Sequence, residues 1–199
     1  MRQTAKSTRQ RDGRRRIDKG RTNYLWLWGA SIATLLLLGL LFWLPSIRGW
    51  SARIVGIQTY ANLAREHRPG PIQYPTTPPA GGAHNPTWQN CGVYDQPIAD
   101  EQAVHSLEHG AVWVAYQPEL PIAEIEQLRT LVQETGFALL APYTDLPAPI
   151  VATAWGVQLR VEEMGDLRLR QFIAEYSQGP QTPELGAPCT GGSGAPLVR

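Results

Sequence analysis

The strongest constraint on the fold is a run of twenty uncharged, mostly apolar residues at positions 25–44. As a helix it would span about 30 Å, the thickness of the hydrocarbon core of a bilayer. Aromatic residues flank the run as they do in membrane helices: Tyr24, Trp26, Trp28, Trp43 and Trp50. We therefore predict one transmembrane helix. A cleaved signal peptide is the less favoured alternative, because its apolar core is usually only about 7–15 residues long.

The two sides of this run differ sharply in charge. Residues 1–24, a basic head, carry nine Lys or Arg and two Asp, whereas residues 45–199 carry nine Arg and fifteen Asp or Glu. Because basic segments stay in the cytoplasm, we expect a single-pass protein of the cell membrane with a cytoplasmic N-terminus and residues 45–199 outside. The acidic charge of residues 45–199 argues against nucleic-acid binding. If this part lies outside the membrane, another protein of the cell envelope is a candidate partner.

Composition divides the exterior part into a stalk, a domain and a tail. In residues 45–68, apolar residues recur at steps of three and four, which predicts a juxtamembrane helix: Ile47, Trp50, Ile54, Ile57, Ala61 and Ala64. Residues 69–190 form the predicted extracytoplasmic domain, whose first part is rich in Pro and Gly and should wrap the domain surface. Residues 191–199 are predicted to be a flexible tail.

Within the domain, the hydrophobic pattern changes between that of strands and that of helices. Short apolar or alternating runs predict strands at residues 111–116, 137–141, 150–155 and 157–162. Helical spacing predicts two main helices, at residues 120–134 and 166–178. This order is typical of an α+β fold, and we predict a compact two-layer domain with a small mixed sheet.

The two cysteines of the chain, Cys91 and Cys189, lie in the part predicted to face an oxidising compartment. An even count at such an address favours a disulfide, which would attach the Pro-rich segment and the tail to the domain. The alternatives are that Cys91 is a free nucleophile served by His105 or His109, or that the cysteines bind a metal.

A dense group of ligand-type side chains surrounds Cys91. His105 and His109 are four residues apart and would share one face of a helical turn, so that both can bind one metal ion. His84, in a loop rich in Pro and Gly, is a candidate third ligand, and His67 and Glu108 are further ones. Three imidazoles with a carboxylate suit zinc or copper. A metal-free hydrogen-bonded network and plain structural packing are the alternatives.

Residues 105–109 also match H-x-x-E-H, the inverted zinc-peptidase motif. In that interpretation Glu108 is the general base and Glu175 is the best-placed third ligand. The motif needs a long helix, but a strand is predicted to begin two residues after His109. The peptidase interpretation is therefore the less favoured one.

Three motifs resemble a known family. They are Y-P-T-T-P-P-A-G-G-A-H-N-P-T-W-Q-N-C-G-V-Y at residues 74–94, A-V-H-S-L-E-H-G-A-V-W at residues 103–113, and G-P-Q-T-P-E-L-G-A-P-C at residues 179–189. These motifs resemble those of the bacterial family named domain of unknown function 3105. The resemblance covers roughly residues 50–190 of the chain. The resemblance implies a membrane-anchored bacterial protein without an established activity, with motif positions at His84, Cys91, His105 and His109.

The favoured function is transition-metal binding, of copper or zinc, by the extracytoplasmic domain. Two other classes stay open. One is a small metal-dependent hydrolase in which Glu108 activates a metal-bound water. The other is a metal-free module that binds an envelope partner through the Pro- and Trp-rich segment.

Overall fold

The computed structural model describes residue 34 and residues 54–198. The predicted transmembrane helix at residues 25–44, the basic head and the first part of the stalk lie outside the described residues, apart from position 34. Among the described residues, no helix is both long enough and apolar enough to cross a bilayer.

A mixed sheet forms the centre of the domain. Its strands occur in the spatial order β1-β6-β5-β3-β4-β2. β4 pairs in parallel with β3 and β2, and the other pairs are antiparallel. The strands are β1 (Gln58–Thr59), β2 (Gly92–Val93), β3 (Val112–Tyr116), β4 (Ala138–Pro142), β5 (Ile150–Ala154) and β6 (Val157–Val161).

Both faces of the sheet are buried. In β3, Val112, Val114 and Tyr116 belong to the core on one face, and Trp113 and Ala115 belong to the core on the other. This alternation follows from the two-residue period of a strand. It also explains why β3 reads as a continuous apolar run, since a central strand needs apolar side chains on both faces.

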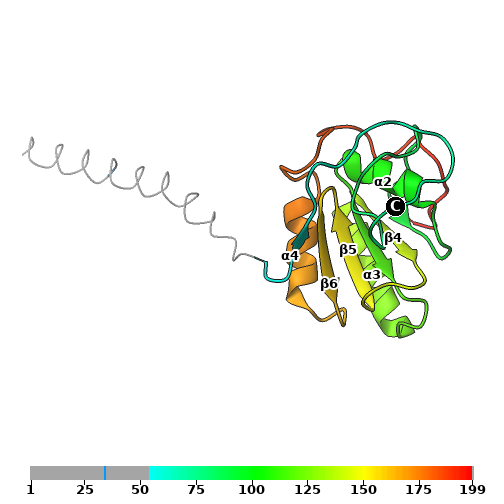
Figure 1. Cartoon of the computed structure of the whole chain (residues 1–199). Helices are drawn as coiled ribbons and strands as arrows, with labels where there is room; N and C mark the ends of the chain where they lie inside the picture. The colour runs from blue at the N-terminus through cyan, green and yellow to red at the C-terminus, as the bar shows by residue number, and fades with distance from the viewer. Residues whose placement is uncertain (1–33, 35–53, 199) are drawn as a thin grey trace, which may run out of the picture. The chain divides into compact units, whose positions relative to one another are not determined.

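Helices cover the two faces unequally. α3 (Ile122–Thr135) and α4 (Leu167–Tyr176) pack on one face. The other face is covered by the shorter α2 (Asp100–Glu108) and by partly buried side chains of the stalk and the Pro-rich segment. Figure 1 shows α2 at one end of the sheet, with the chain before β2 and the C-terminal segment curving around it.

The predicted α+β class with a mixed sheet is confirmed. The prediction of two layers with two main helices missed one helix and one layer. The described residues hold three helices, and material lies on both faces of the sheet. α2 escaped prediction as a main helix because it has only nine residues. Three of these, Ala103, Val104 and Leu107, supply its whole contribution to the apolar core.

The predicted C-terminal end of the first long helix and the predicted N-terminal end of the second are confirmed to within one residue, and the other two ends differ by two residues. α3 ends before Gly136, whose φ of +72° is left-handed and whose N–H binds the carbonyl of Val132. α4 begins after Asp166, whose carboxylate accepts a hydrogen bond of 2.9 Å from the N–H of Arg168.

The prediction of a juxtamembrane helix is wrong for residues 54–68, the part of the stalk that the structure describes. This segment is extended, contains β1, and pairs with β6 through Gln58 and Thr59. Ile54 is buried in the core beside α4, and Ile57 packs against the same core. The apolar spacing therefore reflects an extended edge segment with inward-facing side chains. Gly56, with a φ of +87°, interrupts any helix here.

The C-terminal segment is attached to the domain up to residue 198, the last residue that the structure describes. The prediction that residues 191–199 form a flexible tail is therefore corrected for residues 191–198. Cys91 and Cys189 form a disulfide with a Cα–Cα distance of 5.3 Å, so the predicted pairing is present and a free Cys91 nucleophile is not. Beyond it, the Asn90 amide bonds Gly192 and Gly194, and Val93 pairs with Val198. A side chain at Gly192 would overlap Trp88, so glycine allows this close approach.

Candidate metal centre

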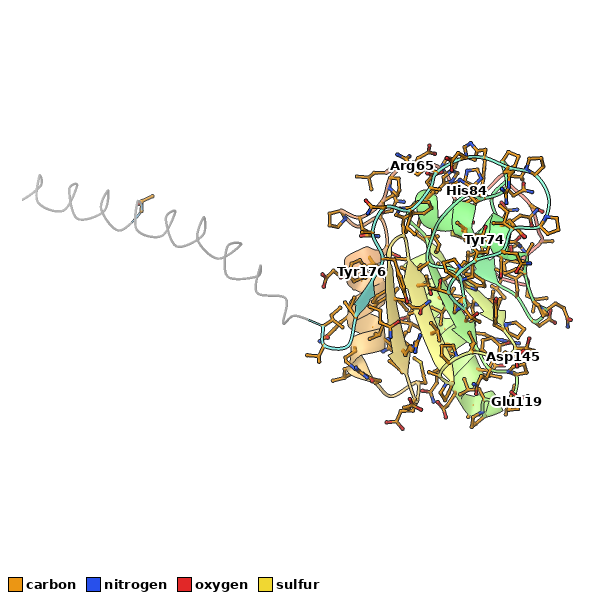
Figure 2. All side chains as sticks on the ribbon, viewed as in Figure 1. Arg65, Tyr74, His84, Glu119, Asp145 and Tyr176 are labelled. Atoms are coloured by element: carbon orange, nitrogen blue, oxygen red, sulfur yellow. A yellow bond between two sulfur atoms is a disulfide. The ribbon has the colours of Figure 1, made fainter. Side chains whose placement is uncertain are left out.

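All four histidines of the chain converge beside α2. The rings of His67, His84 and His105 form a triangle with centroids 4.8 Å apart on every side. The ring of His109 lies 4.6 Å from that of His105. Figure 2 shows Arg65 and His84 together at this end of the domain, with Glu119 and Asp145 at the other.

Backbone pairing brings His67 and His84 together. The two residues form an isolated parallel bridge, in which the N–H of Arg68 binds the carbonyl of His84 at 2.7 Å and the N–H of His84 binds the carbonyl of Glu66 at 3.0 Å. The stalk therefore supplies one ligand position and the glycine-rich loop supplies the next. The burial of the two side chains differs, since His84 is fully buried and the side chain of His67 is 45% exposed.

The end of α2 places the other two histidines. His105 lies in the last turn, and His109 is the residue that caps the helix. Gly110 follows with a φ of +96°, and the N–H groups of Gly110 and Ala111 return to the carbonyls of Leu107 and Ser106. This is a Schellman motif, which requires a residue that tolerates the left-handed conformation. Gly110 therefore ends the helix.

Three buried imidazoles are oriented in the same way. The Nδ1 atoms of His84, His105 and His109 lie 2.8, 2.6 and 2.7 Å from the carbonyl oxygens of Gly82, Asn85 and Pro188. A carbonyl oxygen only accepts hydrogen bonds, so each Nδ1 carries the proton and donates it. When such a ring is neutral, its Nε2 is the nitrogen with the free lone pair. Ligating histidines in metalloproteins are commonly held in this way.

Glu108 places a buried carboxylate among these rings. Its side chain is 1% exposed, and its Oε1 accepts a hydrogen bond of 2.7 Å from Nε of Arg65. Its Oε2 lies 2.9 Å from Nε2 of His84 and 3.8 Å from Nε2 of His67. Neither Oε2 nor the His84 Nε2 has a hydrogen-bond partner. The site thus holds two buried polar atoms in contact, within a group of side chains that could hold a metal ion.

A second carboxylate, Glu184, joins the cluster from the C-terminal segment. Its Oε2 lies 3.6 Å from Nε2 of His109, and its Oε1 lies 3.7 Å from Nη2 of Arg65. Its backbone N–H donates to the carbonyl of Glu108 at 3.0 Å. Sequence analysis missed Glu184 because it lies far from the histidines along the chain. Its place as the sixth residue of the third family motif, at residues 179–189, was the only available signal.

The ligand atoms form two groups that share His105. One group is His67, His84, His105 and Glu108, and the other is His105, His109 and Glu184. Within each group the atoms lie within 4.8 Å of one another. Two nitrogens on one tetrahedral ion with bonds of ~2.1 Å are about 3.4 Å apart, so small side-chain shifts would close either group on an ion. The structure thus brings together in this centre the five residues of the favoured metal site, which are His67, His84, His105, Glu108 and His109, but His84 and His109 belong to different groups.

Glu175, the third ligand expected in the peptidase interpretation, lies outside this centre. Glu175 is exposed on α4, which packs on the face of the sheet opposite α2, and it belongs to neither group. Glu108 is also engaged by Arg65 and His84, which suits a ligand or an orienting anion better than a free general base.

Burial controls the protonation of the shared histidine. Burial, the largest cause, and the neighbouring histidines together lower the pKa of His105 from 6.5 to about 4, against the effect of the Asn85 carbonyl. Trp88 lies against His105 and His109, with ring centroids 5.7 and 4.9 Å away. The neutral ring keeps its Nε2 lone pair available to a metal ion at physiological pH.

Fold and site together define a class of protein: an α+β domain with a mixed sheet, one disulfide and a buried histidine–carboxylate cluster. The chain belongs to the family described as protein of unknown function DUF3105, which matches residues 67–191. The resemblance found in the motifs is therefore confirmed, and the match includes every residue of the two groups. No curated protein and no solved structure matches the chain.

The buried, neutral His105 should make the metal-free protein sensitive to acid. Between pH 6.5 and about 4 the unfolded chain binds a proton at this residue that the folded protein does not. The free energy of unfolding should therefore fall as the pH decreases through this window, by up to about 3 kcal/mol. Urea unfolding with a chelator present, at steps from pH 7 to pH 4, measures this. A His105→Gln variant should show a weaker pH dependence, and an unchanged dependence would contradict the assignment.

Proposed function

We propose that this protein binds one late first-row transition-metal ion, zinc or copper, through His84, His105 and Glu108, with His67 as a further ligand. The observation that carries the proposal is the contact of 2.9 Å between Nε2 of His84 and Oε2 of Glu108. Both atoms are buried, and neither has a hydrogen-bond partner. Two electron-rich atoms repel each other at this distance unless a positive charge joins them.

A proton on His84 is the alternative source of that charge. It would require His84 to donate from both ring nitrogens, since Nδ1 already donates to Gly82. A metal ion satisfies more of the site, because it would also use the Nε2 atom of His105, whose Nδ1 is committed to Asn85, and could use a ring nitrogen of His67. Two separately oriented imidazoles, His84 and His105, in one group with the Glu108 carboxylate therefore favour a metal ion over a proton.

The donor set limits the choice of metal. Imidazole nitrogen and carboxylate oxygen suit Zn²⁺ and Cu²⁺, whereas Cu⁺ prefers thiolate and thioether sulfur. Both cysteines of the chain are in the disulfide, and Met164 is buried in the core beneath α3 and α4. These observations support the divalent ions.

We further propose that the chain is a single-pass membrane protein with a cytoplasmic N-terminus and its domain outside. The uncharged run at residues 25–44 and the charge difference across it support this topology. The disulfide between Cys91 and Cys189 supports it independently, because such bonds persist in oxidising compartments.

Metal content tests the proposed site. The full-length chain, purified in detergent without a histidine tag, should carry close to one zinc or copper ion per chain by elemental analysis. His84→Ala and Glu108→Gln should each lose most of this metal, because each removes one of the two facing acceptors. Glu175→Gln, which changes an exposed carboxylate on α4, is the matched control and should keep it. Wild-type protein that stays metal-free after incubation with either ion would refute the proposal.

Arg65 should strengthen metal binding without being a ligand. Its bond to Oε1 of Glu108 directs Oε2 toward the histidines, and partners of this kind typically contribute about 10- to 100-fold to metal affinity. Competition titration with a chromophoric chelator should show a loss of this order in Arg65→Met and a smaller loss in Arg65→Lys. Arg170→Met, on the exposed side of α4, should bind as the wild type does. If Arg65→Met binds the metal as tightly as the wild type does, Arg65 has no part in metal binding.

The topology and the disulfide share one test. In membranes from expressing cells, both cysteines of the full-length chain should resist a maleimide reagent until a reductant is added. A variant that lacks residues 1–44, and so stays in the cytoplasm, should react without reduction. Free thiols in the full-length chain would place the domain in a reducing compartment.

A further inference from the structure

The two groups of ligand atoms meet at a single residue, His105. Its ring centroid lies 4.8 Å from that of His84 in the first group and 4.6 Å from that of His109 in the second. Its Nδ1 is committed to the carbonyl of Asn85, so only Nε2 can bind a metal. One nitrogen lone pair serves one ion, and the two groups therefore cannot both be complete at the same time.

The charges of the centre also favour one ion. Two carboxylates, Glu108 and Glu184, face a single guanidinium, Arg65, at 2.7 and 3.7 Å. One divalent ion would bring this set of charges to +1, whereas two would bring it to +3 within a few ångströms. Repulsion between two divalent ions so close together, with no carboxylate bridging them, would oppose double occupancy.

The carboxylates of the two groups differ in access to solvent. In the first group, here called the inner group, the side chain of Glu108 is 1% exposed and that of His84 is 0% exposed, and His67, at 45%, is the one exposed member. In the outer group, the side chain of Glu184 is 41% exposed. The groups are connected, because the N–H of Glu184 donates to the carbonyl of Glu108 and Arg65 touches both carboxylates.

We infer that a single ion occupies two alternative positions, with His105 as the ligand common to both. The outer position, formed by His105, His109 and Glu184, receives and releases the ion. The inner position, which adds His67, His84 and Glu108 to His105, retains it. This inference rests on the proposed function and deepens it: the ion is exchangeable cargo, a divalent late transition metal that the domain takes up and passes on.

The test separates the rate of metal binding from its equilibrium. The full-length protein in detergent is mixed with Zn²⁺, and loading is followed by stopped flow; release is followed with an excess of a chromophoric chelator. Glu184→Gln should slow both loading and release by about tenfold or more, because a carboxylate at the mouth of a site attracts cations and speeds their association. Its dissociation constant should change by less than about threefold, since the inner ligands set the equilibrium.

Two variants complete the design. Glu108→Gln removes an inner ligand and should weaken equilibrium binding by more than about tenfold, with loading still fast. Glu175→Gln, an exposed carboxylate outside the centre, should match the wild type in both respects. Equal circular dichroism and melting of Glu184→Gln and wild type show that the exposed substitution leaves the fold intact.

Three results would overturn the inference while leaving the proposed function in place. They are two ions per wild-type chain, unchanged rates in Glu184→Gln, and a loss of affinity in Glu184→Gln as large as that in Glu108→Gln. A wild-type chain that binds no ion refutes the proposed function itself.

Discussion

Three hydrogen bonds from histidine Nδ1 atoms to backbone carbonyls hold the centre of this protein in place. The acceptors belong to Gly82, Asn85 and Pro188, which lie in irregular segments and not in the sheet. The geometry of the site therefore depends on the contacts that attach these irregular segments to the rest of the domain. The N–H of Gly156 binds the carbonyl of Ala80 at 2.7 Å and so ties the glycine-rich loop to the turn between β5 and β6.

The C-terminal segment is fastened by covalent and non-covalent contacts together. Pro188, whose carbonyl orients His109, immediately precedes Cys189 of the disulfide. Gln178 donates a hydrogen bond to the carbonyl of His109, and its own N–H binds the carbonyl of Gly110. The disulfide thus helps to fix the position of His109 in the cluster, in addition to its effect on stability. Sheet, disulfide and loops form one support for the histidines.

The regular part of the fold was readable from the sequence, and the irregular part was not. Strands β3 to β6 and helices α3 and α4 were predicted within a few residues, because their side chains follow the two- and 3.6-residue periods of buried elements. The stalk was wrongly predicted to be a helix because Ile54 and Ile57 are three residues apart, as on a helix face. In the structure both pack against the core from an extended segment at the edge of the sheet. The histidines were found because they are rare and clustered, whereas Glu184 joins them only through the folding of the C-terminal segment, which no local pattern encodes.

The pairing of the stalk with the glycine-rich loop through His67 and His84 has a consequence for the lifetime of the protein in the cell. Under the proposed function, the ion would join the stalk, this loop and α2, which are distant in the chain. Anything that binds only the folded state raises the free energy of unfolding in proportion to the logarithm of its concentration. The metal-loaded protein would therefore be degraded more slowly than the metal-free one. Its abundance would then rise and fall with the supply of metal, without any change in its synthesis.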